Sequence, residues 1–192
     1  MKKSYYVLAS VFLFSILSAA EVQTWQIDPA HSASQFSVRH LGISTVRGTF
    51  TKMSGTLKYD SEDVSKSSLD ATIETKSIDT RVDMRDNDLR SPNFLDVEKY
   101  PTITFKSKRV EKNGEGKLKV TGDLTIRGTT KEVILEVDGP TEPVKDPKGN
   151  FHMGASATTK VNRKDFGVSG APSMVGDDVQ ITIDTELVKQ AN

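Results

Sequence analysis

Residues 80–105 read TRVDMRDNDLRSPNFLDVEKYPTITF, and this is the one stretch where strand-like alternation stops and a helix is expected. Thr80 is placed to cap the helix, because a threonine hydroxyl accepts hydrogen bonds from the free N–H groups of a first turn. Asp83 and Asp86 fall in the early turns, where negative charge suits the positive end of the helix dipole. Pro92 ends the helix, since proline has no N–H to donate and disfavours a helical residue before it.

An apolar run follows the expected helix and leads back into a strand. Its members are Phe94, Leu95, Val97, Tyr100, Ile103 and Phe105. A short helix and an apolar loop near residues 81–100, laid across a β-structure, predict a lid that closes one end of a barrel. Such a barrel would hold an apolar ligand, whereas a packed sandwich has little use for the insertion.

The rest of the chain alternates apolar and polar residues in short segments, which is typical of half-buried β-strands. Residues 68–75 show the pattern most cleanly, with Leu69, Ala71 and Ile73 on one face. We expect an all-β fold of about eight antiparallel strands closed into a barrel, because closure removes exposed edges and leaves room for one small ligand. A filled sandwich is the alternative that alternation alone leaves open. Gly122 is expected to mark a bulge or a tight bend.

The N-terminal segment, residues 1–20, has the three parts of a secretory signal peptide. A basic start at Lys2 precedes an apolar core, residues 7–17, and the small residues SAA at 18–20. The apolar core is shorter than the roughly 20 residues that a transmembrane helix needs, although a retained N-terminal anchor is the alternative. Cleavage predicts a mature chain, residues 21–192, that forms a single domain in the periplasm or outside the cell.

The composition excludes several classes of function. The chain carries 26 Lys and Arg against 26 Asp and Glu, and loss of the two lysines in the signal peptide leaves a net charge of about −2. A chain so balanced has no overall basic field to attract nucleic acid or an anionic membrane. It contains no cysteine, so an exported form would rest on packing and hydrogen bonds without disulfides.

Few residues show a pattern typical of catalysis or metal binding. His31, His40 and His152 lie far apart, without the HExxH spacing that puts two imidazoles on one helix face. The segment GVSGA at residues 167–171 lacks the final glycine of the GxSxG nucleophile elbow. The sequence therefore predicts no catalytic residues, no metal site and no cofactor, although a metal site assembled in space stays open.

Four segments resemble the YceI-like lipid-binding (polyisoprenoid-binding) family. They are WQIDPAHSASQFSVRHLGISTVRGTF at 25–50, LRSPNFLDVEKYPTITFKS at 89–107, GDLTIRGTTKEV at 122–133 and ASATTKVNRKDFGV at 155–168. The resemblance spans nearly the whole mature chain. It implies a lipocalin-like extended antiparallel β-barrel with a long internal channel, and a bacterial periplasmic or secreted location. The implied ligand is a polyisoprenoid, an isoprenoid quinone or a fatty-acyl amide.

The residues expected to line this channel are apolar or small and lie on the inner faces of strands or in the lid. They are Phe36, Val38, Phe50, Leu69, Ile73, Leu89, Phe94, Leu95, Tyr100, Ile103, Phe105, Leu124, Leu135, Ala155, Ala157 and Ile181. Small side chains such as Ala155 and Ala157 leave space inside the barrel. Each position fits ordinary barrel core equally well.

Charged residues near the lid and near the end of the chain are candidates for contact with the polar head group of a lipid. They are Arg81, Asp86, Arg90, Arg163 and Asp165. Solvated ion pairs on the outer surface are the alternative interpretation of the same residues.

The leading hypothesis is a non-enzymatic binding protein that holds a hydrophobic lipid for transport, storage or sequestration, with a stress response among the roles that the resemblance implies. It predicts no nucleic-acid partner and no stable membrane insertion after signal cleavage, and it leaves a homodimer open. One alternative is an enzyme that modifies an isoprenoid or quinone, with Asp86, Arg163 and Asp165 as its polar candidates. Another is a filled-barrel interaction protein that binds through the loop at residues 139–150.

Overall fold

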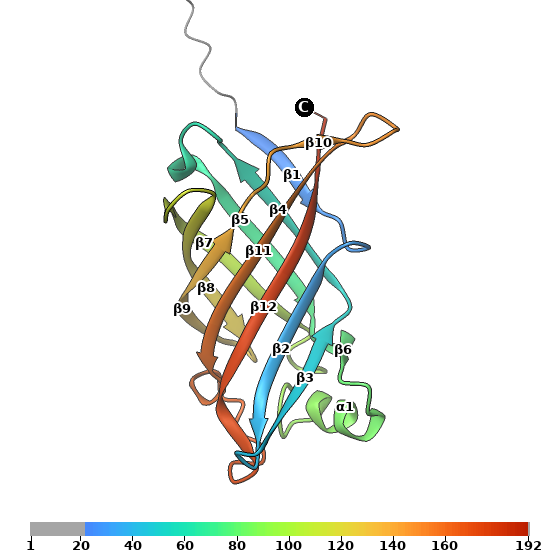
Figure 1. Ribbon diagram of the computed structural model, residues 1–192. Helices are drawn as coiled ribbons and strands as arrows, with labels where there is room; N and C mark the ends of the chain where they lie inside the picture. The colour runs from blue at the N-terminus through green and yellow to red at the C-terminus, as the bar shows by residue number, and fades with distance from the viewer. Residues whose placement is uncertain (1–21, 192) are drawn as a thin grey trace, which may run out of the picture.

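The computed structural model describes residues 22–191, which form a barrel with a short helix beside its lower end in Figure 1. The predicted signal peptide, residues 1–20, lies outside the described residues. Within residues 22–191, no helix is long and apolar enough to cross a membrane.

Most of the described chain is β-strand. The strands are β1 (Gln23–Ile27), β2 (Ala33–His40), β3 (Ser44–Phe50), β4 (Met53–Tyr59), β5 (Ser68–Glu74), β6 (Ile78–Asp79), β7 (Thr102–Lys112), β8 (Lys117–Ile126), β9 (Thr129–Asp138), β10 (Val144–Lys145), β11 (Phe151–Asn162) and β12 (Val175–Lys189). The helix is α1 (Asp83–Arg90), and short 3₁₀ turns lie at Val64–Lys66, Thr75–Ser77 and Arg163–Phe166.

Eight of these strands close into an antiparallel barrel, which confirms the predicted fold class. Their order around the barrel is β1, β4, β5, β7, β8, β9, β11 and β12, and β12 pairs back onto β1. Short turns join many of the neighbouring strands, as antiparallel pairing permits. Closure leaves the ring without a continuous free edge, which protects it from pairing with other chains.

Strand β12 joins the barrel to an extension of its wall. Its 15 residues pair with β11 along one edge. On the other edge, Leu187 faces Ile27 of β1, and Ile181 faces Phe36 of β2. The hairpin of β2 and β3 therefore continues the wall beyond the end of β1, and it reaches the end of the molecule where α1 lies (Figure 1).

Side-chain alternation places one face of each long strand inside the barrel. On β12, Val179, Ile181 and Ile183 face the interior, while Asp178 before them and Gln180 between them are exposed. This is the period of two that a pleated strand imposes. The inner face predicted from the sequence is confirmed for this strand.

Gly122 lies at a bulge, as the sequence predicts. Ser107 of β7 faces Gly122, and the register then shifts so that Arg109 faces Thr121, which places the extra residue on β7. Gly122 also meets a second requirement, because a Cβ atom there would lie 2.5 Å from the Phe105 ring and 2.5 Å from the carbonyl oxygen of Lys106. The glycine lets the ring of Phe105 lie close against β8.

The helix forms where the sequence predicts it, but the prediction that Thr80 caps it is wrong. Val82 occupies the N-cap position and makes no side-chain hydrogen bond there. Instead, the Asp86 carboxylate accepts hydrogen bonds from the backbone N–H of Thr80, at 2.8 Å, and from its hydroxyl. Both residues are buried. The interaction therefore ties α1 to the segment that follows β6.

The segment after α1 forms the predicted lid. The helix ends at Arg90, before Pro92, as the sequence predicts. Leu95 and Val97 are buried, and their backbone N–H groups donate to carbonyl oxygens of the last helical turn, at 3.0 Å each. The lid is therefore fixed to the helix, with its apolar side chains turned inward.

We expect Asp86→Ala to destabilise the fold by about 1–3 kcal/mol, because it leaves the buried N–H and hydroxyl of Thr80 without their acceptor. Asp83 lies exposed on the same helix, and the matched variant Asp83→Ala should change the free energy of unfolding by less than about 1 kcal/mol. Urea denaturation measures both variants. Equal losses in the two would show that the contact with Thr80 contributes nothing.

Candidate functional site

An internal cavity of about 250 Å³ lies inside the barrel and is lined almost entirely by apolar side chains. All eight barrel strands contribute to its wall, together with the lid. Ile27 and Leu187 line it beside β1, and Val38, Val175 and Leu89 line it towards the end near α1. The cavity therefore extends along the barrel. The volume lies just below the roughly 300–1,000 Å³ that is common for ligand pockets, and the extension along the barrel favours a chain-shaped ligand.

The predicted wall residues line the cavity with the exception of Tyr100. The Tyr100 ring packs against the β8–β9 turn, where a Cβ atom on Gly128 would approach it to 2.6 Å. The amino group of Lys99 lies 5.3 Å from the centre of the same ring. Tyr100 therefore stands outside the cavity because it packs on a turn. Contact between a lipid and the other wall residues stays a prediction.

Several residues of the wall were not singled out from the sequence. They include Ile27, Met53, Leu57, Tyr59, Ala71, Val110, Leu118, Val120, Ile126, Val137, Pro140 and Ile183. Most continue the period-two pattern of a strand already recognised, so counting by two along each strand would have found them. Pro140 lies in a loop, where no such signal exists.

Glycines on the wall let large rings lie flat against it. Phe36 faces Gly48 across the β2–β3 pair, and a Cβ atom on Gly48 would lie 2.5 Å from the Phe36 ring. Phe105 covers Gly122 in the same way. Aromatic rings placed over strand glycines occupy the wall itself. Ala157 on β11 adds a small side chain to the same cavity wall.

Of the five residues predicted to meet a head group, only Arg163 lines the cavity. Its guanidinium donates, at 2.7–2.9 Å, to the backbone carbonyl oxygens of Val168, Gly170, Val175 and Gly176. Burial lowers the pKa of Arg163, and Asp177, 3.8 Å away, opposes that shift. Arg163 therefore holds a loop across one end of the barrel with most of its N–H groups already engaged.

The structure places the other four candidates away from the cavity wall. Arg81 and Asp165 are exposed. Asp86 is bonded to Thr80 as described above, and Arg90 donates to two backbone carbonyls of the segment before the helix. These contacts give Asp86 and Arg90 a role in positioning the lid. Contact of any of the four with a lipid head group stays a prediction.

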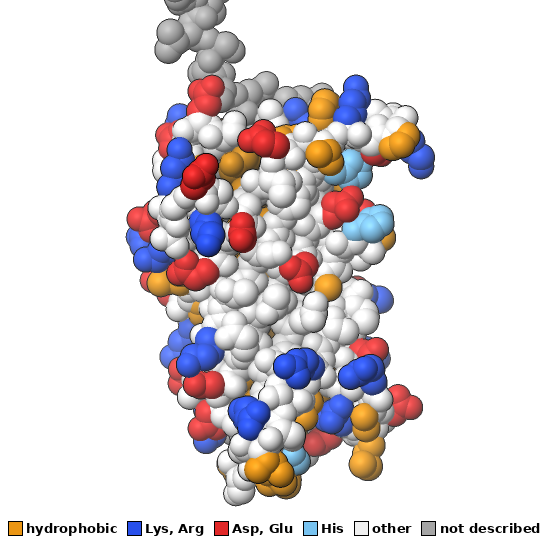
Figure 2. Space-filling view, viewed as in Figure 1, with side chains coloured by type: hydrophobic (Ala, Val, Ile, Leu, Met, Phe, Trp, Pro, Cys, Tyr) orange, Lys and Arg blue, Asp and Glu red, His pale blue; other side chains and the backbone are white. Residues whose placement is uncertain are grey.

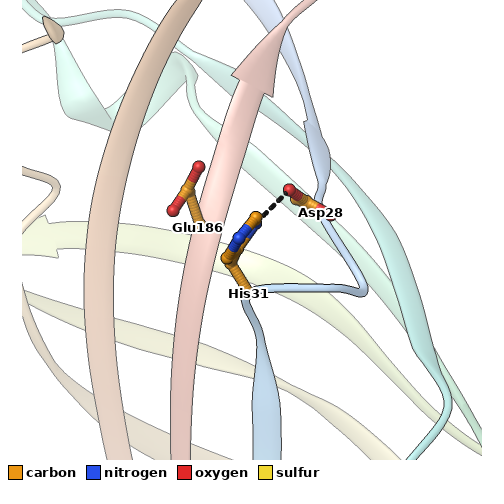
Figure 3. A group of neighbouring side chains, drawn as sticks. All are labelled: Asp28, His31 and Glu186. Carbon is orange, nitrogen blue, oxygen red and sulfur yellow. Dashed lines mark hydrogen bonds and ion pairs between the residues drawn. The ribbon is translucent and has the colours of Figure 1, made fainter. Parts of the chain in front are cut away.

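A group of histidines and carboxylates lies outside the cavity. Figure 3 shows His31 pointing towards Asp28, with 2.7 Å between Nδ1 and Oδ2, and Glu186 nearby on β12. Ligand atoms of these three lie within 4.8 Å of one another, so this part of the described chain could hold a metal ion. His152 extends the group, with Nδ1 2.7 Å from Glu186 and Nε2 3.2 Å from Asp146.

Protonated histidines explain this group without a metal. The hydrogen bond to Asp28 raises the pKa of His31, and the hydrogen bond to Glu186 raises the pKa of His152. A carboxylate lies at each ring nitrogen of His152, an arrangement that favours the imidazolium form, in which both nitrogens donate. No sequence pattern indicated the group, since Asp146, His152 and Glu186 come from segments that only the barrel brings close to Asp28 and His31.

A family model described as a YceI-like domain matches residues 25–187. Protein YceI of Escherichia coli O157:H7 is 36% identical to the chain over 194 residues, with 99% of this chain and 100% of that protein covered. The crystal structure of a Campylobacter jejuni YCEI protein is similar, with 32% identity, a TM-score of 0.69, and coverage of 80% of this chain and 90% of that chain.

A more distant structure shares the fold. It is a polyisoprenoid binding domain from Saccharophagus degradans, with a TM-score of 0.66 over 88% of this chain and 100% of that chain. Its sequence identity is 12%, so the likeness is one of fold alone.

We expect Glu186→Gln to lower the pKa of His152 towards the ordinary histidine value of about 6.5, because the lost carboxylate is the main cause of the raised pKa. A pH titration monitored by NMR of the imidazole resonances measures this pKa. Asp184→Asn, two residues earlier on the same strand, is the matched control and should leave the His152 titration in place. A His152 pKa that Glu186→Gln does not move would contradict the assignment.

The same ion pairs make stability depend on pH. Since the pKa of His152 is raised in the folded state, its contribution is complete below about pH 6.5 and is lost as the pH rises through the folded-state pKa. We therefore expect the stability difference between wild type and His152→Gln to shrink as the pH rises from 6 to 9. Urea denaturation across that range measures it, and a difference that grows with pH would show the opposite sign.

Proposed function

Because the chain belongs to the YceI-like domain family, we propose that it binds one long apolar lipid inside its barrel. The ligand classes we infer are a polyisoprenoid, an isoprenoid quinone or a fatty-acyl amide. The protein would hold this lipid for transport, storage or sequestration. One observation carries the proposal, namely an apolar cavity that extends along a closed barrel and is capped by an apolar lid.

The wall supplies enough free energy for such a ligand. Burying one CH₂ group contributes about 0.8 kcal/mol, so each five-carbon isoprene unit adds a few kcal/mol before ordering costs. Polar groups then need only orient one end of the chain. The polyisoprenoid binding domain from Saccharophagus degradans has the same fold, which supports this choice of ligand class.

Export is part of the proposal. The predicted signal peptide, residues 1–20, and the absence of cysteine are consistent with a mature protein that works in the periplasm or outside the cell. A carrier in that compartment meets lipids that cannot cross water unaided, and a closed apolar cavity shields them from it.

The two alternatives receive less support from the geometry. An enzyme needs polar groups that converge on a reacting atom, yet Asp86 is buried against Thr80 and Asp165 is exposed. A filled-barrel interaction protein needs a packed interior, whereas this barrel encloses a cavity. We therefore favour lipid binding without turnover.

We expect Ala157→Trp to weaken lipid uptake by about tenfold or more, because the indole side chain would occupy space in the cavity that the lipid needs. The probe is ubiquinone-8 delivered from detergent micelles and quantified after solvent extraction of the repurified protein. Thr158→Trp is the matched control, since Thr158 is the exposed neighbour on the outer face of β11. It should take up the probe as the wild type does.

Two results would count against the proposal. Uptake by a folded Ala157→Trp variant at the wild-type level would place the lipid elsewhere. Failure of both the wild type and Thr158→Trp to retain ubiquinone-8, a fatty-acyl amide or a polyprenol would favour the interaction protein.

A further inference from the structure

Exposed apolar side chains gather at the end of the barrel where the β2–β3 hairpin turns. Leu41 and Ile43 in that turn are 54% and 79% exposed, and Met174 in the loop before β12 is 50% exposed. The backbone N–H of Leu41 donates to the carbonyl oxygen of Met174, at 2.7 Å, so the two loops lie side by side. We name these three residues the apolar tip. Figure 2 shows hydrophobic side chains at this lower extremity.

The helix adds a second exposed point near the same end. Met84 of α1 is 82% exposed and Val82 just before the helix is 43% exposed. Their segment lies against the hairpin, since a Cβ atom on Gly48 of β3 would come within 2.7 Å of the Thr80 side chain. Single exposed apolar residues are normal on any protein, but a group projecting from one end marks an interaction site.

The backbone conformation of Leu41 gives independent support for an interaction site at the apolar tip. Its φ is 51°, in the left-handed region that favours glycine or asparagine. A leucine holds this conformation at a cost in energy that a polar turn residue would avoid. The turn therefore retains an apolar side chain in a position where both exposure and backbone geometry disfavour it.

The charge on the β2–β3 hairpin is one-sided. No Asp or Glu occurs between Asp28 and Asp60, so the hairpin carries the exposed Arg39 and Arg47 without an acidic residue of its own. The neighbouring loop, residues 167–176, has no charged residue. The near-zero charge of the whole chain hides this local excess of positive charge.

Acidic residues on the adjoining strand do not cancel that charge. Asp177 and Asp178, near the start of β12, are paired with Lys164, at 2.9 Å, and with Lys160, at 3.2 Å. Exposed apolar side chains beside two arginines match the interface of a bilayer that contains anionic lipids, where apolar groups enter the acyl region and cations meet phosphates.

The apolar tip also adjoins the end of the cavity. Met174 is followed directly by Val175, and Leu41 lies three residues beyond Val38; both valines line the cavity. Arg163 holds the carbonyl oxygens of Gly170 and Val175, so the tip loop is part of the structure that closes this end. A surface resting on the apolar tip would therefore face the end of the cavity that the lid and this loop cover.

We propose that the apolar tip docks the protein on an anionic lipid bilayer, with Leu41, Ile43 and Met174 entering the interface and Arg39 and Arg47 meeting phosphate groups. The lipid then passes between bilayer and cavity at this end of the barrel. The bilayer would be the partner with which the proposed carrier exchanges its lipid, so this proposal rests on the proposed function. Docking and lipid uptake are measured in separate experiments. Docking is peripheral and reversible, without a membrane-spanning segment.

The test is flotation of the folded chain, residues 21–192, with vesicles of phosphatidylglycerol and phosphatidylethanolamine or of phosphatidylcholine alone. Every strand lies within Gln23–Lys189, so this chain retains the whole barrel. The wild type should float with the anionic vesicles. Ile43→Glu should bind them about tenfold more weakly, because an apolar group that entered the interface is replaced by a charge of the same sign as the lipid.

Val144→Glu is the matched control. Val144 is 63% exposed on β10, at the opposite end of the barrel (Figure 1), and its variant should float as the wild type does. Arg47→Gln should weaken binding to the anionic vesicles several-fold and leave the weak binding to phosphatidylcholine unchanged. Met174→Glu provides a second variant at the apolar tip and should behave as Ile43→Glu does.

Three results would overturn docking: no flotation of the wild type, equal flotation of Ile43→Glu, or an equal loss in Val144→Glu. A change in the oligomeric state of Ile43→Glu in the absence of vesicles would assign the tip to self-association instead. Uptake of micelle-delivered ubiquinone-8 should be the same in Ile43→Glu and the wild type. If neither the wild type nor Ile43→Glu takes up the probe, lipid carriage is contradicted, whereas the flotation result still tests docking.

Discussion

Closure of the sheet through β12 is the constraint on which the rest of the structure depends. β12 pairs with β11 from Asn162 to His152 and with β1 at its far end, so the backbone hydrogen bonds of the ring are satisfied without a covering layer. Alternate side chains must then point into one enclosed space. Whether that space fills or stays open is decided by side-chain size, and here glycines beneath Phe36 and Phe105 keep the large rings against the wall.

The barrel end near α1 is closed by irregular structure. Near α1, the lid and the loop held by Arg163 cover the cavity with backbone that needs its own partners. Asp86, Arg90 and Arg163 supply those partners, which explains why charged side chains are buried there. The exposed apolar tip belongs to the same end, so closure of the cavity and contact with a lipid surface depend on neighbouring loops.

The sequence predicts the parts of this arrangement that local periodicity controls. Alternation identifies the strands and most of the residues on their inner faces, and the break at residues 80–105 identifies the helix and lid. Local periodicity does not predict which partner a polar side chain meets. Thr80 is therefore wrongly assigned as a helix cap, whereas its hydroxyl donates to Asp86. Tyr100 is wrongly assigned to the cavity wall, and the group around His152 is not predicted, for the same reason. Both depend on segments that become neighbours only after the barrel closes.

The central claim is that the cavity holds a long apolar lipid. The most direct measurement is native mass spectrometry of the mature protein purified from its own host, followed by solvent extraction and identification of whatever is released. The account predicts one long-chain isoprenoid or acyl lipid per protein chain. A folded protein that carries no lipid under gentle conditions, and acquires none when long-chain lipids are supplied, would contradict it.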